Sequence, residues 1–470
     1  MGKHRHLEAP IPYDMWLRVQ LAYALPAINI YFLYGALSVV QGIYAIHFGL
    51  PLSTIAAVLL VSRLFDAVSD PLVGYVVDRN YARTGSRKPF MVSGALLLIV
   101  SAYFLFIPPV AVTAGYFLGW LLGFYLAFTL FEIPHLAWGN DLSSSAEDKN
   151  NLYSYRGIAA YIGGFLFFLI PLLPMYEKSD ITPETLHIAV LATGLLILPV
   201  LFIMVKSAPN SHPFKGHHIQ PERLKESEQD YQHGGLFFLI CNRPFLLFLG
   251  ALFLAGTGIG MWQTMSFIFI DSYLGLGEYF ALISMLSLTG AALSIVIWRW
   301  LAGYIGKQKS WSLGMMLMGI GFLGLGFLAP GERSYLRLLT LMILIHSGIA
   351  TITLLANSLL SDIVDYTAWK YYRSCGAILF AIFALVAKSN FAIGGALALA
   401  VASQYGFDPS ANFYSKDAIQ GIRLGVAWLP ATTVLCSTVF ILSIPINERF
   451  HRLICRRLER RMQNPLVQGC

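Results

Sequence analysis

Apolar runs of about 20 residues recur along the whole chain, and each is long enough to cross a hydrocarbon core about 30 Å thick. Continuous runs favour membrane-spanning helices, because a β-barrel would show alternating strands of about ten residues. Only 12% of the residues are charged, whereas soluble domains carry about 25%. The sequence therefore predicts an all-α membrane protein with twelve transmembrane helices, at roughly residues 20–47, 53–77, 90–109, 114–139, 155–175, 187–205, 241–270, 280–301, 311–330, 336–361, 375–401 and 421–445.

A polar segment rich in His, Pro, Lys and Glu divides these runs into six and six. Gly74-Tyr75 near the end of the second run recurs as Gly303-Tyr304 near the end of the eighth, which favours an internal repeat. Paired six-helix repeats are typical of one large class of secondary transporters. The predicted parts are an N-terminal six-helix half at 1–206, a central loop at 207–240, a C-terminal six-helix half at 241–446 and a basic tail at 447–470.

The net charge of +7 comes from an uneven distribution of Lys and Arg among the loops. Basic residues gather in both terminal segments, in the central loop and in the loops that hold Arg79, Lys307 and Lys370. Because basic loops stay on the cytoplasmic side, both termini are expected in the cytoplasm, at a bacterial-type inner (plasma) membrane. Topology explains the charge, so no nucleic acid partner is expected. The basic tail is expected to lie against membrane lipid.

Asp66 and Asp70 lie inside the second apolar run, where each acid costs roughly 2.5–3.5 kcal/mol. Charged residues at that depth usually serve the movement of ions or solutes. Together with Arg63 and Ser69 they are spaced i, i+3, i+6 and i+7, which places all four on one helix face. The simpler alternative is a buried ion pair in which Arg63 neutralises one of the two acids.

The fourth run adds a third carboxylate, Glu132, and a hydroxyl, Thr129, at a depth comparable with that of Asp70. Three carboxylates with the hydroxyls of Ser69 and Thr129 would form a hard, oxygen-rich site that suits Na⁺ as the bound metal ion. The same cluster could bind a proton, because close like charges favour protonation of a carboxylate. The sequence predicts a cation site and leaves Na⁺ and H⁺ open.

Two bases and one polar stretch are candidate solute contacts. Lys388 lies about halfway along the eleventh run, where a base has no structural reason to be unless an acid faces it. Arg156 opens the fifth run, and its planar fork could clamp a solute, although snorkelling to the interface would also explain it. Trp262 and Gln263 follow a glycine-rich stretch that could serve helix packing or line a cavity.

Four stretches resemble the glycoside–pentoside–hexuronide:cation symporters, the melibiose-permease-like branch of the major facilitator superfamily. They are residues 63–74, Glu132-Ile133-Pro134 with Asp141 and Arg156, Ser361-Asp362-Ile363-Val364-Asp365-Tyr366 with Trp369, and Lys388. The resemblance implies a fold of two pseudo-symmetric six-helix halves and cation coupling at Asp66, Asp70 and Glu132. It also implies that Arg156 and Lys388 face a central cavity. Asp362, Asp365 and Trp369 are expected near a cytoplasmic gate, and we assign Arg63 and Asp141 to gating as well.

The first run departs from the family pattern. Sugar-transporting members carry an acid there that holds solute hydroxyls, whereas no charged residue lies between Arg18 and Arg63. Asn29 is the remaining candidate contact in this run. We predict a monomeric cation-coupled symporter of a small-molecule solute, most simply a sugar or glycoside, that works by alternating access. The alternative is a lysophospholipid transporter of the same branch. No catalytic constellation indicates an enzyme, and no cofactor is expected beyond the coupling Na⁺ or H⁺.

Overall fold

The computed structural model describes residues 13–142, 146–174, 176, 178–207, 241–371, 376–411, 413–446 and 448–463. Within these ranges the regular structure is entirely helical. The predicted all-α fold class is therefore confirmed. The predicted central loop falls almost wholly outside the described residues, and the predicted domain boundaries stay a prediction.

The N-terminal bundle consists of six long helices. They are α1 (Tyr13–Ile46), α2 (Leu52–Thr84), α3 (Lys88–Phe106), α4 (Ala114–Asp141), α5 (Ala146–Leu169) and α6 (Pro183–Ser207), with a short 3₁₀ turn, η1 (Ile170–Leu172), at the end of α5. Helix α1 packs along α5 and α6, while α4 packs along α2 and α3.

The C-terminal bundle repeats this count. Its helices are α9 (Arg243–Ile268), α10 (Gly277–Ile305), α11 (Lys307–Leu325), α12 (Tyr335–Tyr371), α13 (Gly376–Gln404) and a last span built from α14 (Lys416–Arg423), η4 (Leu424–Trp428) and α15 (Leu429–Leu442). Two short segments, η2 (Phe269–Tyr273) and η3 (Glu332–Ser334), follow α9 and precede α12. Beyond the bundle, α16 (Glu448–Gln463) packs on α12.

Eleven of the described helical segments are long and apolar enough to cross a membrane. The remaining long helix, α11, has 19 residues and begins with Lys307-Gln308-Lys309, which lowers its apolar content. It nevertheless packs between α12 and α15 within the bundle. The twelve helices therefore match the predicted count, although several ends move. Helix α12, for example, continues to Tyr371, ten residues beyond the predicted end at 361.

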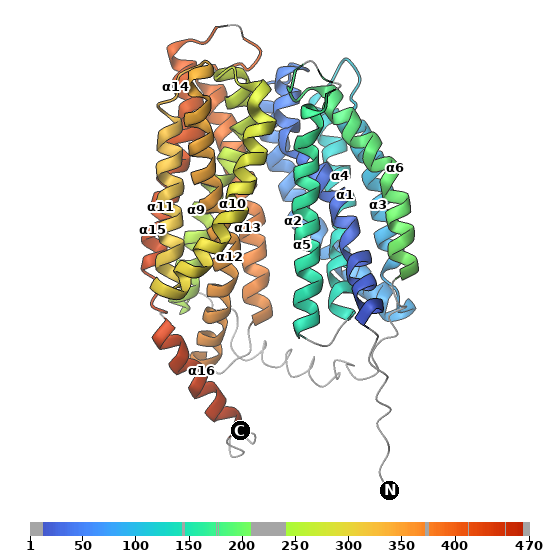
Figure 1. Cartoon of the computed structure of the whole chain (residues 1–470), viewed down its shortest axis with the longest axis vertical. Helices are drawn as coiled ribbons and strands as arrows, with labels where there is room; N and C mark the ends of the chain where they lie inside the picture. The colour runs from blue at the N-terminus through green and yellow to red at the C-terminus, as the bar shows by residue number, and fades with distance from the viewer. Residues whose placement is uncertain are drawn as a thin grey trace.

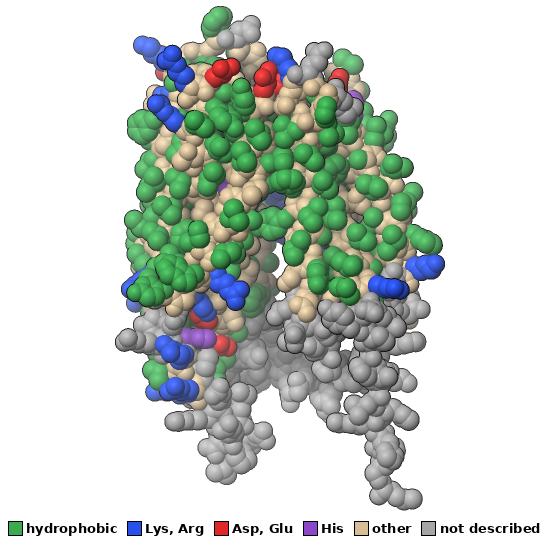
Figure 2. Space-filling model, viewed as in Figure 1, with side chains coloured by type: hydrophobic (Ala, Val, Ile, Leu, Met, Phe, Trp, Pro, Cys, Tyr) green, Lys and Arg blue, Asp and Glu red, His purple; other side chains and the backbone are tan. Residues whose placement is uncertain are grey.

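The two bundles stand side by side, and the start of α1 and helix α16 lie at one face, which we call the terminal face (Figure 1). A broad green belt of apolar side chains covers the middle of the face seen in Figure 2, with charged side chains above and below it. This pattern is that of a protein embedded in a bilayer. The chain is an integral membrane protein.

The bundles pack along α2 and α13, and they are also in close contact near the face away from the terminal face, which we call the opposite face. A β-carbon on Gly42 of α1 would lie 2.3 Å from the ring of Phe267 of α9. The rings of Phe168 and Phe280 lie 6.1 Å apart across the same seam. Nearer the terminal face, the seam is hollowed (Figure 2). The described conformation is therefore closed at the opposite face and open toward the terminal face.

Two glycines at the terminal face end α2 and α10 in different backbone conformations. Gly85, between α2 and α3, has a φ of 68°, and Gly306, between α10 and α11, has a φ of 93°. Both values lie where a side chain is disfavoured, so glycine is required for a tight reversal. The ψ values differ, 12° at Gly85 and 156° at Gly306, so the two turns are not equivalent and add nothing to the internal repeat that the sequence indicates.

Candidate cation and solute site

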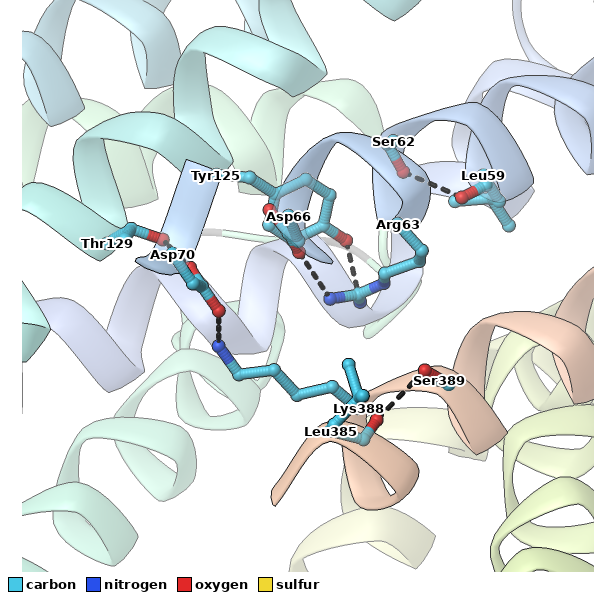
Figure 3. Close-up of polar contacts among 10 residues, drawn as sticks. All are labelled: Leu59, Ser62, Arg63, Asp66, Asp70, Tyr125, Thr129, Leu385, Lys388 and Ser389. Carbon is cyan, nitrogen blue, oxygen red and sulfur yellow. Dashed lines mark hydrogen bonds and ion pairs between the residues drawn. The ribbon is translucent and has the colours of Figure 1, made fainter. Parts of the chain in front are cut away.

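Asp66 lies on α2 and is paired with a base one turn earlier in the same helix. Its Oδ2 lies 3.1 Å from Nη1 of Arg63, and Nη2 of Arg63 donates to the Tyr125 hydroxyl of α4 at 2.9 Å (Figure 3). The guanidinium also lies over the Tyr125 ring, 4.4 Å from its centre. The i, i+3 spacing makes this pair possible within one helix. The structure therefore contains the simpler alternative, in which Arg63 neutralises one acid, Asp66.

Asp70 lies one turn further along α2 and contacts both halves of the molecule. Its Oδ1 accepts a hydrogen bond from the Thr129 hydroxyl of α4 at 2.8 Å. Its Oδ2 forms an ion pair with Nζ of Lys388, which reaches over from α13 of the C-terminal bundle (Figure 3). The acid that was expected to face Lys388 is thus Asp70, 318 residues earlier in the chain.

Glu132 belongs to a separate pair within the N-terminal bundle. Its Oε1 pairs with Nη2 of Arg156 from α5, and both side chains are largely buried, with 14% and 12% of their surface exposed. The Arg156 guanidinium lies 5.9 Å from the centre of the Tyr31 ring of α1. Snorkelling of Arg156 to the interface does not occur, because the guanidinium is held inward by Glu132.

The three carboxylates therefore do not converge as the sequence analysis expected. Asp66, Asp70 and Glu132 each have their own cationic partner, and the described residues contain no group of three His, Cys, Asp or Glu side chains that could hold a metal ion. Neutralising each acid separately lowers the cost of burying it. Helix periodicity predicted the common depth, but it could not predict these pairings.

Two oxygen atoms near Asp70 remain without a hydrogen-bond partner. They are Oδ1 of Asp66 and Oγ of Ser69, and both atoms are buried. Buried oxygens without a hydrogen-bond partner are costly, so such atoms in a native site call for an explanation such as a role in binding an ion. Carboxylate and hydroxyl oxygens are ligands that hard cations prefer.

Two cavities adjoin this cluster and share Arg63 and Lys388 as lining residues. The larger one, about 400 Å³, lies between the bundles. Its other polar and aromatic lining residues are Tyr34, Ser38, Gln41, Tyr125, Gln263, Thr264 and Phe391. The smaller one, about 200 Å³, lies between α2 and α13, and its walls include Ala67, Pro71, Ala381, Ala384 and Leu385.

Of the predicted solute contacts, the structure brings Gln263 and Lys388 to the larger cavity. Trp262 is 1% exposed and packs on Phe322 inside the C-terminal bundle instead. Successive residues are about 100° apart around a helix, so the side chains of Trp262 and Gln263 point in different directions. Asn29 is buried in α1 and does not line either cavity.

Three of the predicted gating residues, Asp362, Asp365 and Trp369, lie on α12 in the C-terminal bundle, whereas Arg63 lies on α2 and pairs with Asp66. Lys307 Nζ lies 2.8 Å from Oδ1 of Asp362, and His451 of α16 lies 2.9 Å from Oδ2 of Asp365. Trp369 packs on Phe450 of α16, with ring centres 6.0 Å apart. These contacts join α11, α12 and α16 rather than the two bundles. The side chain of Asp141 lies outside the described ones, although its backbone ends α4.

Sequence reasoning missed several residues of the site. Tyr125, Tyr34, Ser38 and Thr264 have side chains that are common in helix cores, and no charge marks them. A signal for Tyr125 did exist, because it lies one turn before Thr129 and two turns before Glu132 on one face of α4. His451 could not be found because its partners lie more than 80 residues earlier in the chain.

Comparison with known proteins agrees with this architecture. Residues 22–448 match the model of a family described as MFS/sugar transport protein. An uncharacterized symporter of Bacillus subtilis is 24% identical, with 89% of each chain covered. The glucuronide carrier protein homolog of Escherichia coli is 22% identical, covering 92% of this chain and 93% of its own.

More distant proteins share the fold. The sphingosine-1-phosphate transporter MFSD2B of Xenopus tropicalis is 21% identical, with 83% of this chain and 80% of the relative covered. The crystal structure of a mutant of the nucleoside transporter NupG superposes with a TM-score of 0.66 at 13% identity, over 92% of this chain and all of NupG. These matches confirm the resemblance to the glycoside–pentoside–hexuronide symporters and the prediction that the protein is a transporter and not an enzyme. The chain thus belongs to the family of MFS/sugar transport proteins.

Proposed function

We propose that the protein is a cation-coupled symporter of a sugar or glycoside that works by alternating access, with the terminal face in the cytoplasm. The observation that carries this proposal is the position of Asp70, which accepts a hydrogen bond from Thr129 of its own bundle and an ion pair from Lys388 of the other. A single carboxylate thus joins the two bodies that must move relative to one another during transport.

The coupling step follows from competition for this carboxylate. A cation or proton that binds Asp70 removes the charge that holds Lys388, so the ammonium group becomes free to bind solute in the adjoining cavity. Solute held by Lys388 in turn keeps Asp70 available for the cation. Each ligand therefore strengthens binding of the other, and this coupling is reciprocal by thermodynamic necessity.

The oxygen atoms around Asp70 fit a small hard cation. Oδ1 of Asp66 and Oγ of Ser69 are buried without a hydrogen-bond partner, and the Thr129 hydroxyl already contacts Asp70. A sodium ion there would take carboxylate and hydroxyl oxygens, whereas a proton would need only Asp66 or Asp70. Glu132 is paired with Arg156, whose guanidinium lies 5.9 Å from the centre of the Tyr31 ring, and neither residue lines the two cavities.

The larger cavity suits a hydroxyl-rich solute. Gln41, Gln263 and Thr264 offer donors and acceptors, and Tyr34 and Tyr125 offer aromatic surface. A volume of about 400 Å³ lies within the range of small-molecule sites. The named relatives include a glucuronide carrier homolog and an isoprimeverose transporter, which supports a sugar derivative as solute.

One observation favours a lipid instead. The smaller cavity between α2 and α13 has mostly apolar walls, and the neighbouring α2 side chains Leu64, Val68 and Leu72 are 64%, 63% and 59% exposed. An acyl chain could lie along such a surface while its headgroup reaches Arg63 and Lys388. The relative MFSD2B, named as a transporter of sphingosine-1-phosphate, makes this the second candidate.

The decisive experiment is solute uptake into proteoliposomes, with and without a sodium or proton gradient, for the wild type, Asp70→Asn and the control Asp78→Asn. Asp78 lies further along α2 and pairs with Arg87, and the Asp78 side chain is 72% exposed. Gradient-driven accumulation should disappear in Asp70→Asn and persist in Asp78→Asn. Accumulation that survives in Asp70→Asn would overturn the coupling role of this carboxylate.

The solute class is tested separately by thermal stabilisation. The purified protein is titrated with sugars, with uronides and with lysophospholipids, each in the presence and absence of sodium. We expect a sugar or uronide to raise the melting temperature more strongly when sodium is present. Stabilisation by lysophospholipids alone would favour the lipid candidate.

A further inference from the structure

Arg63 lies at the boundary between the two cavities described above. On α2, the larger cavity is bordered by Leu59 and Arg63, and the smaller one by Arg63 together with Asp66 and Asp70. In the described part of the chain, neither acid borders the larger cavity. The solute and the cation of the proposed function would therefore occupy neighbouring spaces, and the Arg63 side chain borders both.

Tyr125 of α4 holds Arg63 from the side of the larger cavity, which it lines. Its ring centre lies 4.4 Å from the guanidinium carbon, and its hydroxyl accepts a hydrogen bond from Nη2 of Arg63 at 2.9 Å. The other terminal nitrogen, Nη1, donates to Oδ2 of Asp66 at 3.1 Å. One planar guanidinium thus divides its donors between a hydroxyl on the solute side and a carboxylate on the cation side (Figure 3).

The Tyr125 hydroxyl keeps a proton that it can donate. It accepts from Arg63, and in the described part of the chain no group accepts its own proton. A phenolic hydroxyl both donates and accepts, so an oxygen of a solute in the larger cavity can take this proton as a hydrogen bond. Donation of the proton strengthens the bond that the hydroxyl accepts from Arg63, because linked hydrogen bonds polarise one another. A guanidinium drawn toward Tyr125 binds Asp66 less firmly.

We propose that Tyr125 is a positioning residue that acts through Arg63 and links solute binding in the larger cavity to cation binding at Asp66. This inference rests on the proposed function and adds a second link to the one between Asp70 and Lys388. Solute bound to Tyr125 draws Arg63 away and leaves the Asp66 carboxylate to the cation, and Oδ1 of that carboxylate is already without a hydrogen-bond partner. By linkage, a cation at Asp66 leaves Arg63 to Tyr125 and strengthens solute binding.

The substitution Tyr125→Phe isolates the hydroxyl, because the ring over the guanidinium is kept. Nη2 of Arg63 then loses its acceptor, and the planar fork can turn both terminal nitrogens toward Asp66 as a bidentate pair. One added hydrogen bond to a charged group contributes roughly tenfold in affinity. The variant should therefore need about ten times more sodium for half saturation or, if the coupling cation is a proton, a pH about one unit lower.

The measurement is the melting temperature of the full chain in detergent. Sodium is titrated against choline at constant ionic strength, and pH is titrated in sodium-free buffer. The matched control is Tyr44→Phe, which removes a buried hydroxyl that donates to the Leu105 carbonyl at 2.7 Å and borders neither cavity. It should lower the melting temperature while keeping the wild-type midpoint of the titration. An equal shift of the midpoint in both variants would overturn the proposal.

A second background tests whether Tyr125 acts through Arg63. Arg63→Lys replaces the planar fork with a single ammonium group, so adding Tyr125→Phe should then leave the cation midpoint unchanged. A further tenfold shift in the double variant would show that the tyrosine acts by another route and would overturn the proposal.

The link to solute is measured with isoprimeverose and with glucuronate, each titrated with and without the cation. The factor by which the cation strengthens sugar binding should be smaller in Tyr125→Phe than in the wild type, and an equal factor would overturn the link. A wild type that responds to neither sodium nor pH would overturn the proposed function and this inference with it. A wild type that responds, with the same midpoint in Tyr125→Phe, would overturn the inference alone.

Discussion

Phe267 of α9 presses against Gly42 of α1 so closely that a β-carbon on the glycine would lie 2.3 Å from the ring. This contact joins the two bundles near the opposite face, where the described conformation is closed. Only a residue without a side chain permits it. A single substitution at this contact can therefore alter the equilibrium between the state open toward the terminal face and the state open toward the opposite face.

We predict that Gly42→Val shifts the protein toward the state that is open at the opposite face. The added side chain would overpack the closed seam, and overpacking typically costs about 1–3 kcal/mol. The reporter is the substitution Gln263→Cys in the larger cavity, made in a protein from which the five natural cysteines have been removed. A shift toward the state open at the opposite face should make this cysteine react faster with a membrane-impermeant thiol reagent added from that face. Gly74→Val is the control, because nothing lies within 4 Å of its added β-carbon. Unchanged labelling of the Gly42→Val protein would contradict this prediction.

Asp70 and Lys388 should show strong energetic coupling. Lys388→Gln leaves the Asp70 carboxylate without its ammonium partner, and Asp70→Asn leaves the opposite charge behind. The double variant removes both charges and should be more stable than the less stable single variant. Contacting charged pairs typically give coupling energies of about 0.5–3 kcal/mol in a double-mutant cycle. Thermal unfolding in detergent measures it, and additive effects would argue against a direct pair.

Glu132→Gln should destabilise the N-terminal bundle because it leaves the Arg156 guanidinium without a charge partner in a largely buried place. Removing one partner of a buried pair costs about 3–5 kcal/mol. The comparison is Lys178→Gln, which breaks an exposed pair with Glu278, where the two side chains are 70% and 47% exposed. Surface pairs contribute about 0–1 kcal/mol. Similar melting temperatures for both variants would show that the Glu132 pair is not effectively buried.

Asp180, outside the membrane spans, should make stability depend on pH. Burial raises the pKa of its carboxyl above the ordinary value of 3.8, Glu278 raises it further, and Lys178 and His47 act in the opposite direction. An acid with a raised pKa stabilises the fold fully below 3.8, and this contribution is lost as pH rises through the raised pKa.

The measurement for Asp180 is the melting temperature between pH 4 and pH 7. Asp180→Asn should lose less stability over this range than the wild type, because an amide does not ionise. Asp417→Asn, which changes an exposed carboxyl at the start of α14, should retain the wild-type profile. Superimposable profiles for all three proteins would refute the prediction.

Much of the fold could be predicted from the sequence because the bilayer imposes one length on every span. The apolar runs gave the helices, and the i, i+4 spacing of Asp66 and Asp70 placed both acids on one face of α2. The pair between Arg63 and Asp66 is local, so helix geometry alone could suggest it.

The ion pairs between different helices could not be predicted from helix periodicity. Lys388 could meet any acid at its depth, and only the packing of α13 against α2 selects Asp70. In the same way, the packing of α4 against α5 pairs Glu132 with Arg156 and keeps it out of a common carboxylate cluster. Periodicity fixes direction around a single helix, whereas these choices depend on which helices become neighbours.

Helix α12 has 37 residues and is therefore about 55 Å long, well beyond the ~30 Å of a hydrocarbon core. Its far end, which carries Asp365 and Trp369, holds α16 through His451 and Phe450. Because α12 is one continuous helix, a displacement of α16 would also displace the part of α12 that lies within the bilayer. A soluble molecule that binds α16 could thus change the rate of transport without entering the membrane.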